Sequence, residues 1–149
     1  MKNTFISILS LLWLIGCQSD SESISAEIGR TFQLEVGKET RITGQSDSLK
    51  IVVQSISDGR CPQGVECVRA GNAQVQLTIS EGSDAQMVDL CIGDCHLDFD
   101  KYAGFVEQDT ASVAMATQTY SVILKDVLPY PAIGKSSDEK EAVLEVSLQ

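Results

Sequence analysis

Histidine and basic residues are scarce in this chain of 149 residues. Its one histidine is His96, and it has no Gly-x-Ser-x-Gly motif, no His-Glu-x-x-His motif and no glycine-rich phosphate loop. The common nucleophilic, zinc-protease and nucleotide chemistries therefore lack their residues, and we expect a protein that is not an enzyme and uses no cofactor. The 11 Lys and Arg residues face 21 Asp and Glu residues, which disfavours nucleic acid as a partner and suits a basic protein.

The apolar segment at the start of the chain is too short to span a bilayer, which needs roughly twenty residues. Lys2 precedes the apolar run Phe5 to Ile15, a pattern typical of an export signal. The run ends in Leu14-Ile15-Gly16-Cys17, which resembles the lipobox of bacterial lipoproteins. That resemblance implies that residues 1–16 are a signal peptide. It also implies that Cys17, as the new amino terminus, carries a diacylglycerol on its thiol and an acyl chain, such as palmitate, on its amino group.

The residues after Cys17 bear on where the protein is held. Two or more acyl chains make membrane anchoring stable where one would be marginal. In lipoproteins of Gram-negative bacteria an Asp directly after the acylated Cys favours the inner membrane, and Gln18 stands there instead. The resemblance thus implies a lipid-anchored protein of the cell envelope, at the outer membrane. Residues 17–29 are rich in Ser and acidic residues, which predicts a flexible tether before a domain at 30–149.

The rest of the chain alternates apolar and polar residues with period two, and no segment shows the pattern of a long amphipathic helix. We therefore expect an all-β domain, an antiparallel two-sheet sandwich of immunoglobulin-like type, with a small β-barrel as the alternative. The segments expected as strands are Thr31–Val36, Glu39–Thr43, Leu49–Ser57, Ala73–Ser80, Gln86–Ile92, Thr119–Leu128 and Ala142–Leu148.

Besides Cys17 the chain has four cysteines, an even number that predicts two disulfides in an exported protein. Cys61 with Cys67 and Cys91 with Cys95 is the favoured pairing, because each pair is close in sequence and brackets turn residues. Crossed pairings would close longer loops and stabilise more if the geometry allowed them. A metal site of these thiolates with His96 is another interpretation, but the five residues between Cys61 and Cys67 exceed the usual spacing of zinc ligands.

Two segments resemble a motif of uncharacterised bacterial lipoproteins and secreted proteins. The first runs from Asp58 to Val75 and contains Arg-Cys-Pro, a second Cys after four further residues and Ala-Gly-x-Ala; the second is Leu124 to Pro131, ending in Pro-Tyr-Pro. The resemblance implies a fold and a location rather than an activity. Family members often have an aromatic residue where this chain has Arg69, and the pair Cys91 and Cys95 is not part of the shared pattern.

The segment between Cys61 and Cys67 has two interpretations. A small ring containing a proline is a rigid connection between strands, which stabilises the fold. It could also preorganise a recognition loop. The candidate binding residues of that loop are Arg60, Gln63, Glu66 and Arg69.

An acidic segment follows the fourth cysteine. Asp94, Asp98 and Asp100 are candidate Ca²⁺ ligands, although the chain lacks an EF-hand pattern and a solvated acidic loop is the alternative. Tyr102 and Phe105, just after it, have two interpretations: they form a second candidate binding edge, or they cap the core, as such residues more often do.

These observations favour a lipid-anchored bacterial envelope lipoprotein with a non-catalytic binding or structural accessory domain, held to the membrane and binding a protein partner. One alternative is an inhibitor of a cationic enzyme that attacks the envelope, such as a lysozyme or a protease. A second alternative is a Ca²⁺-dependent binding module.

Overall fold

The computed structural model describes residues 24–44, 49–97, 104–134 and 139–149. Across these ranges the chain forms ten strands and one short 3-10 helix, η1. No helix in this part of the chain is long and apolar enough to cross a membrane. The elements are β1 (Ile24–Glu27), β2 (Thr31–Glu35), β3 (Glu39–Thr43), β4 (Leu49–Asp58), β5 (Asn72–Glu81), β6 (Asp84–Asp94), η1 (Cys95–Leu97), β7 (Phe105–Val106), β8 (Asp109–Ala114), β9 (Thr119–Leu128) and β10 (Glu141–Leu148).

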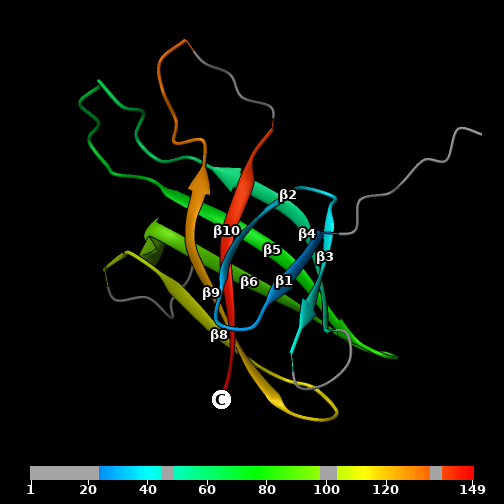
Figure 1. Cartoon of the computed structure of the whole chain (residues 1–149). Coiled ribbons are helices and arrows are strands. Elements are labelled where there is room, and N and C mark those ends of the chain that lie inside the picture. The colour runs from blue at the N-terminus through cyan, green and yellow to red at the C-terminus, as the bar shows by residue number, and fades with distance from the viewer. Residues whose placement is uncertain (1–23, 45–48, 98–103, 135–138) are drawn as a thin grey trace, which may run out of the picture.

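The strands form two sheets packed as a β-sandwich (Figure 1). The six-stranded sheet has the order β1-β3-β4-β5-β6-β7, and the four-stranded sheet has the order β2-β10-β9-β8. The pairings are antiparallel except for β1 with β3, which is parallel. The predicted all-β, two-sheet fold is therefore confirmed. Its larger sheet is a meander from β3 to β7, whereas immunoglobulin domains divide their strands into ABED and CFG sheets.

The core lies between the two sheets and follows from the period-two pattern. In β5, Ala73, Val75, Leu77 and Ile79 are buried, and the residues between them are partly exposed. Because successive side chains of a strand point to opposite faces, this alternation fixes which face of the sheet is internal. Strands β9 and β10 contribute the opposing layer, with fully buried side chains that include Tyr120, Val122, Leu124, Ala142, Leu144 and Val146.

Strand β1 lies within the residues expected to form the tether, so that expectation is wrong from Ile24 onward. Ala26 is buried and belongs to the core. Its carbonyl accepts a hydrogen bond of 3.2 Å from the Thr43 hydroxyl, and the Gly29 amide donates to the Val146 carbonyl at 2.7 Å. Residues 24–27 form a strand because they pair with the edge of β3 through the backbone. The Ser-rich composition of the segment does not predict this pairing. Cys17 and the expected signal peptide lie outside the described residues.

Strand β4 contains an irregularity that redirects its side chains. The pairing with β5 shifts between Val53 and Ser55, so that Ile56 lies opposite Val75 and packs against the core. Strict alternation from the buried Val53 would place Ile56 on the opposite face, and the bulge between Val53 and Ser55 reverses the alternation beyond it. Strands β7 and β8 were also not predicted. Strand β8 is composed mainly of small and polar residues, and Asp109 and Val113 are its buried residues.

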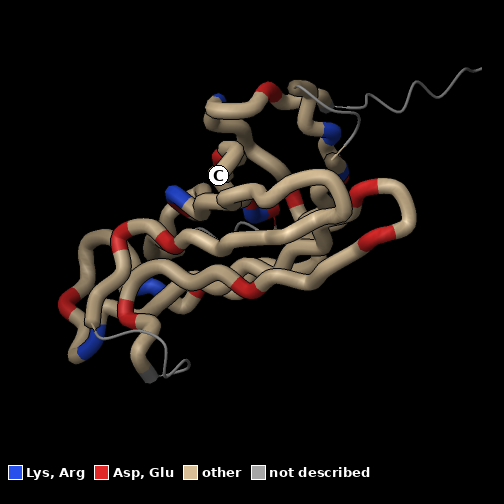
Figure 2. The backbone as a smooth tube through the Cα atoms, turned by 90° about the horizontal axis from the view of Figure 1, so that it is seen from below, with Lys and Arg blue, Asp and Glu red and all other residues tan. Residues whose placement is uncertain are grey.

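Acidic residues are spread over turns and strands of both sheets, and basic residues are fewer (Figure 2).

Candidate binding site

Both disulfides form between the cysteines that are close in sequence, as predicted. Cys61 is bonded to Cys67 and Cys91 to Cys95, each with 6.0 Å between the Cα atoms. Cys91 and Cys95 are buried, whereas Cys67 is exposed. All four sulfur atoms are therefore in disulfide bonds and none is a thiolate. The interpretation of a thiolate metal site is wrong.

The loops near these disulfides converge at one end of the sandwich because two glycines allow close backbone contact. The Gly71 carbonyl accepts a hydrogen bond of 2.9 Å from the Asp94 amide, and the Ala70 carbonyl accepts one of 2.7 Å from the Cys61 amide. A Cβ atom on Gly71 would lie 2.0 Å from the Gly59 carbonyl oxygen, and one on Gly93 would lie 2.5 Å from the Gly71 oxygen. Both glycines have positive φ angles. Only glycine fits these positions without a shift of the backbone.

The loop after β9 is fastened to the loop that contains the first disulfide. The Gln63 amide donates a hydrogen bond of 2.9 Å to the Pro131 carbonyl, and Gln63 forms an isolated parallel bridge with Ala132. The two segments that resemble the lipoprotein motif are thus neighbours in space. In Figure 1 these loops, coloured green and orange, extend at the upper left, away from β1.

Arg60 holds this end of the molecule together rather than facing solvent. Its side chain is 7% exposed. Nε donates to Asp58 Oδ1 at 2.9 Å, Nη1 to Asp126 Oδ1 at 2.7 Å, and Nη2 to Asp58 Oδ2 at 2.9 Å and to the Val127 carbonyl. The guanidinium carbon lies 4.3 Å from the centroid of the Tyr130 ring. The prediction that Arg60 belongs to a displayed recognition set is therefore wrong, because its donors are used within the fold.

The ion pairs around Arg60 determine the charge state of Asp58. Lys140 also contacts Asp58 Oδ2, at 3.0 Å. Burial alone would raise the pKa of Asp58, but the hydrogen bonds from Arg60 and Lys140 outweigh it and hold that pKa below its ordinary value. Burial would likewise lower the pKa of Arg60, and its bonds to Asp58 and Asp126 raise it instead. Both groups are charged at neutral pH, and the cluster ties β4, β9 and the start of β10 together.

The other members of the predicted binding loop are exposed. Gln63, Glu66 and Arg69 lie on the loop that the first disulfide closes or just after it, and their side chains face solvent. Between them Val68 is 103% exposed, and Val65 is 45% exposed. The loop therefore has a rigid base and an outer surface that is partly apolar.

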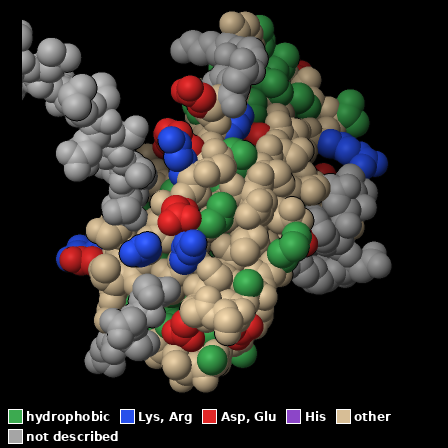
Figure 3. All heavy atoms as spheres, turned by 90° about the vertical axis from the view of Figure 1, so that its right-hand side faces the viewer, with side chains coloured by type: hydrophobic (Ala, Val, Ile, Leu, Met, Phe, Trp, Pro, Cys, Tyr) green, Lys and Arg blue, Asp and Glu red, His purple; other side chains and the backbone are tan. Residues whose placement is uncertain are grey.

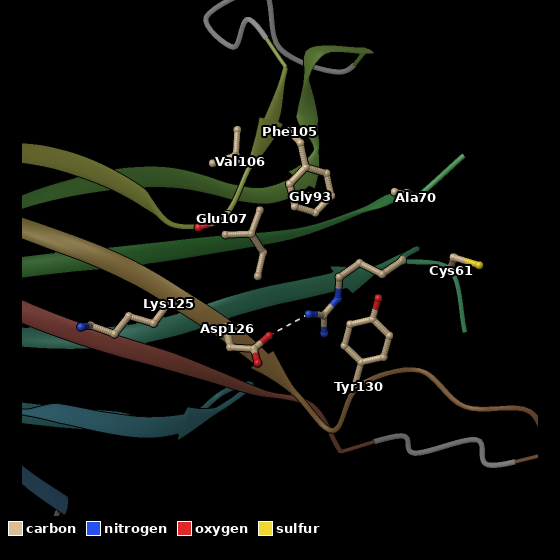
Figure 4. Close-up of a pocket in the computed structure, with 12 residues that line it drawn as sticks. Cys61, Ala70, Gly93, Phe105, Val106, Glu107, Lys125, Asp126 and Tyr130 are labelled. Atoms are coloured by element: carbon tan, nitrogen blue, oxygen red, sulfur yellow. Dashed lines mark hydrogen bonds and ion pairs between the residues drawn. The ribbon is translucent and has the colours of Figure 1, made fainter. Parts of the chain in front are cut away.

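A hollow of about 330 Å³ lies beside Arg60, at the ends of β4, β6, β7 and β9 (Figure 4). In that view the ring of Phe105 lies above the ring of Tyr130, with Glu107 to the left of Phe105. Asp126 lies to the left of Tyr130, joined to Arg60 by a dashed line, and Lys125 lies farther to the left. Phe105 is 67% exposed. The remaining lining residues are Arg60, Cys61, Ala70, Gly71, Ile92, Gly93 and Val106.

Two exposed apolar residues, Phe105 and Tyr130, line this hollow, and further exposed apolar residues lie on the neighbouring loops. We define the apolar loop-end surface as Val65, Val68, Phe105, Tyr130 and Ile133, which are all exposed. The contacts of Gln63 with Pro131 and Ala132, and the shared lining of the hollow, bring their loops together. Figure 3 shows hydrophobic side chains gathered at the upper end of the molecule, where these loops lie in Figure 1.

Of the predicted calcium ligands, Asp94 is described, and Asp98 and Asp100 lie outside the described residues together with Tyr102. Asp94 Oδ1 lies 2.6 Å from His96 Nδ1. Within the described ranges no group of three His, Cys, Asp or Glu residues is placed to hold a metal ion. The calcium site stays a prediction.

Sequence reasoning missed Asp58, Asp126, Tyr130 and Glu107 as residues of this site. The first three lie within the two motif segments, which were noted for their pattern and not for complementary charge. No family model, curated protein or solved structure matches the chain. The function is therefore argued from the geometry of the site.

Proposed function

We propose that this protein is a lipid-anchored lipoprotein of the bacterial cell envelope whose β-sandwich binds a protein partner without catalysis. The observation that carries the proposal is the apolar loop-end surface on loops held by a disulfide and by the Arg60 ion pairs. Large exposed apolar side chains grouped on neighbouring loops are typical of an interaction site. Loops that are already rigid lose little conformational entropy on binding, so the contact area contributes more fully to affinity.

The position of the anchor is compatible with this binding surface. If Cys17 is acylated, six residues lie between it and Ile24, the first residue of β1, so that the two are at most about 25 Å apart. The domain would then be held close to the membrane at its β1 edge. Because the apolar loop-end surface lies away from β1 in Figure 1, it would remain accessible to a partner in the aqueous envelope.

Site-specific photocrosslinking in intact cells tests the binding surface. A photoreactive residue at Val68 is expected to give a crosslinked product of one defined mass in the membrane fraction. The matched control is Met87, which is also exposed and apolar but lies in the middle of β6. Equal crosslinking at the two positions, or none at Val68, would contradict the proposal.

An enzyme inhibitor is the second candidate function, favoured by the exposed ring closed by Cys61 and Cys67. Inhibitors of this kind insert a rigid loop into an active site, and the acidic chain suits a cationic enzyme such as a lysozyme. Loss of lysozyme or protease activity on addition of the protein, relieved by Arg69→Ala or Glu66→Gln, would support it. Arg60→Ala is unsuitable for this test because Arg60 stabilises the loop.

A further inference from the structure

The hollow between Phe105 and Tyr130 has the size and lining of a site for one long side chain. Its volume of about 330 Å³ lies at the lower end of the range of small-ligand sites. The apolar part of the lining comes from the two rings with Ile92 and Val106. An aliphatic stem can pack there while a polar head group stays near the rim.

The two cationic side chains at the hollow are committed to other partners. Arg60 uses Nε, Nη1 and Nη2 for Asp58, Asp126 and the Val127 carbonyl. Lys125 Nζ lies 2.8 Å from Glu145 Oε2. Neither side chain therefore offers an uncompensated positive charge to an anionic ligand.

The two carboxylates at the hollow have oxygen atoms that bind none of the residues that the structure describes. Glu107 is exposed and makes no ion pair or hydrogen bond with the residues that the structure describes. Asp126 binds Arg60 and the Val127 amide through Oδ1, and its side chain is 44% exposed, which leaves Oδ2 available. Since Arg60 and Lys140 together balance Asp58 and Asp126, Glu107 gives the hollow an excess of negative charge.

We propose that this hollow binds the side chain of a lysine or arginine presented by a basic protein partner. The cationic head group would lie between Glu107 and Asp126, and the exposed ring of Phe105 would pack against the aliphatic stem. The Tyr130 ring, which already contacts the Arg60 guanidinium, forms part of the wall. The inference rests on the proposed function and deepens it, because it names the chemistry of the partner.

NMR titration of the full chain, purified in detergent micelles and labelled with nitrogen-15, tests the proposal. The probes are N-acetyl-arginine amide, N-acetyl-lysine amide, N-acetyl-norleucine amide and N-acetyl-glutamate amide. The two cationic probes are expected to shift the amide signals of Gly71, Gly93 and Phe105, with affinity at least about threefold above that of the norleucine probe. Binding by the cationic probes is also expected to weaken with added salt.

Two variants and a control locate the contacts. Glu107→Gln is expected to lower the affinity for the two cationic probes about threefold and to leave the affinity for the norleucine probe unchanged. Phe105→Ala is expected to lower the affinity for the arginine, lysine and norleucine probes. The control is Glu35→Gln, at an exposed acidic position of β2, which is expected to change none of these affinities. Tighter binding of the glutamate probe, or equal binding of norleucine and lysine probes, would overturn the proposal. If the probes fail while Val68 still crosslinks, the cation site is wrong and the proposed function stands.

Discussion

The Arg60 guanidinium lies 4.3 Å from the centroid of the Tyr130 ring and 2.7 Å from Asp126. These contacts join the end of β4 to the end of β9 and the loop beyond it. Arg60 also donates hydrogen bonds from Nε and Nη2 to the two oxygens of the buried Asp58 carboxylate. One side chain thus fixes the loops that bear the proposed binding surface.

Replacing Arg60 is expected to destabilise the whole domain. Arg60→Ala leaves the Asp58 carboxylate, which is 1% exposed, with Lys140 as its remaining charged partner, and breaking a buried pair in this way costs about 3–5 kcal/mol. Urea unfolding followed by circular dichroism measures the change. Arg41→Ala, at an exposed position of β3, is the control and is expected to change stability by less than about 0.5 kcal/mol. Equal urea midpoints for the Arg60 and Arg41 variants would show that Arg60 does not stabilise the domain through these ion pairs.

The lowered pKa of Asp58 predicts a loss of stability in acid. A carboxyl whose pKa is lower in the folded than in the unfolded state contributes stability above its ordinary value of 3.8. That contribution is lost as the pH falls through the lowered folded value. The wild-type urea midpoint is therefore expected to fall between pH 5 and pH 2. Asp58→Asn should be less stable at pH 5 and show a smaller decrease over the same interval; a parallel decrease would exclude Asp58 as the source.

Gly71 is expected to tolerate no side chain. Gly71→Ala places a Cβ atom 2.0 Å from the Gly59 carbonyl at a positive φ, and such overpacking together with backbone strain costs about 3 kcal/mol. Gly82→Ala is the matched control, since Gly82 also has a positive φ but has open space around it. Its cost is expected to be about 1 kcal/mol. Thermal unfolding of both variants gives the comparison, and a Gly71 variant no less stable than the Gly82 variant would argue against close contact of the loops.

The two disulfides are expected to differ in their rate of reduction. Cys67 is exposed, whereas Cys91 and Cys95 are buried, and exchange with an external thiol requires access to a sulfur atom. Dithiothreitol under native conditions should therefore open the Cys61–Cys67 bond first. Timed alkylation followed by peptide mass spectrometry measures both rates. The chain-entropy estimate for so small a ring is about 2 kcal/mol, so the sandwich should remain folded when this bond is open.

The strands whose alternation is regular could be predicted from the sequence, and those created by pairing could not. Ala73 to Ile79 alternate without interruption, and their burial is as predicted. Strand β1 forms because it pairs with β3, a contact that local composition does not encode. In the same way, Asp126 lies 66 positions after Arg60, so the ion pair that turns Arg60 inward has no local signal. The paired cysteines were predictable because their partners are four and six residues apart.

The intact mass of the protein extracted from cell membranes without reduction tests the account most directly. We predict a chain that begins at Cys17 and carries a diacylglyceryl group and one further acyl chain. Its four remaining cysteines should become alkylated after reduction and not before. A chain that retains residues 1–16 without lipid, or that alkylates at those cysteines before reduction, would contradict the account of an anchored envelope protein with disulfide-stabilised binding loops.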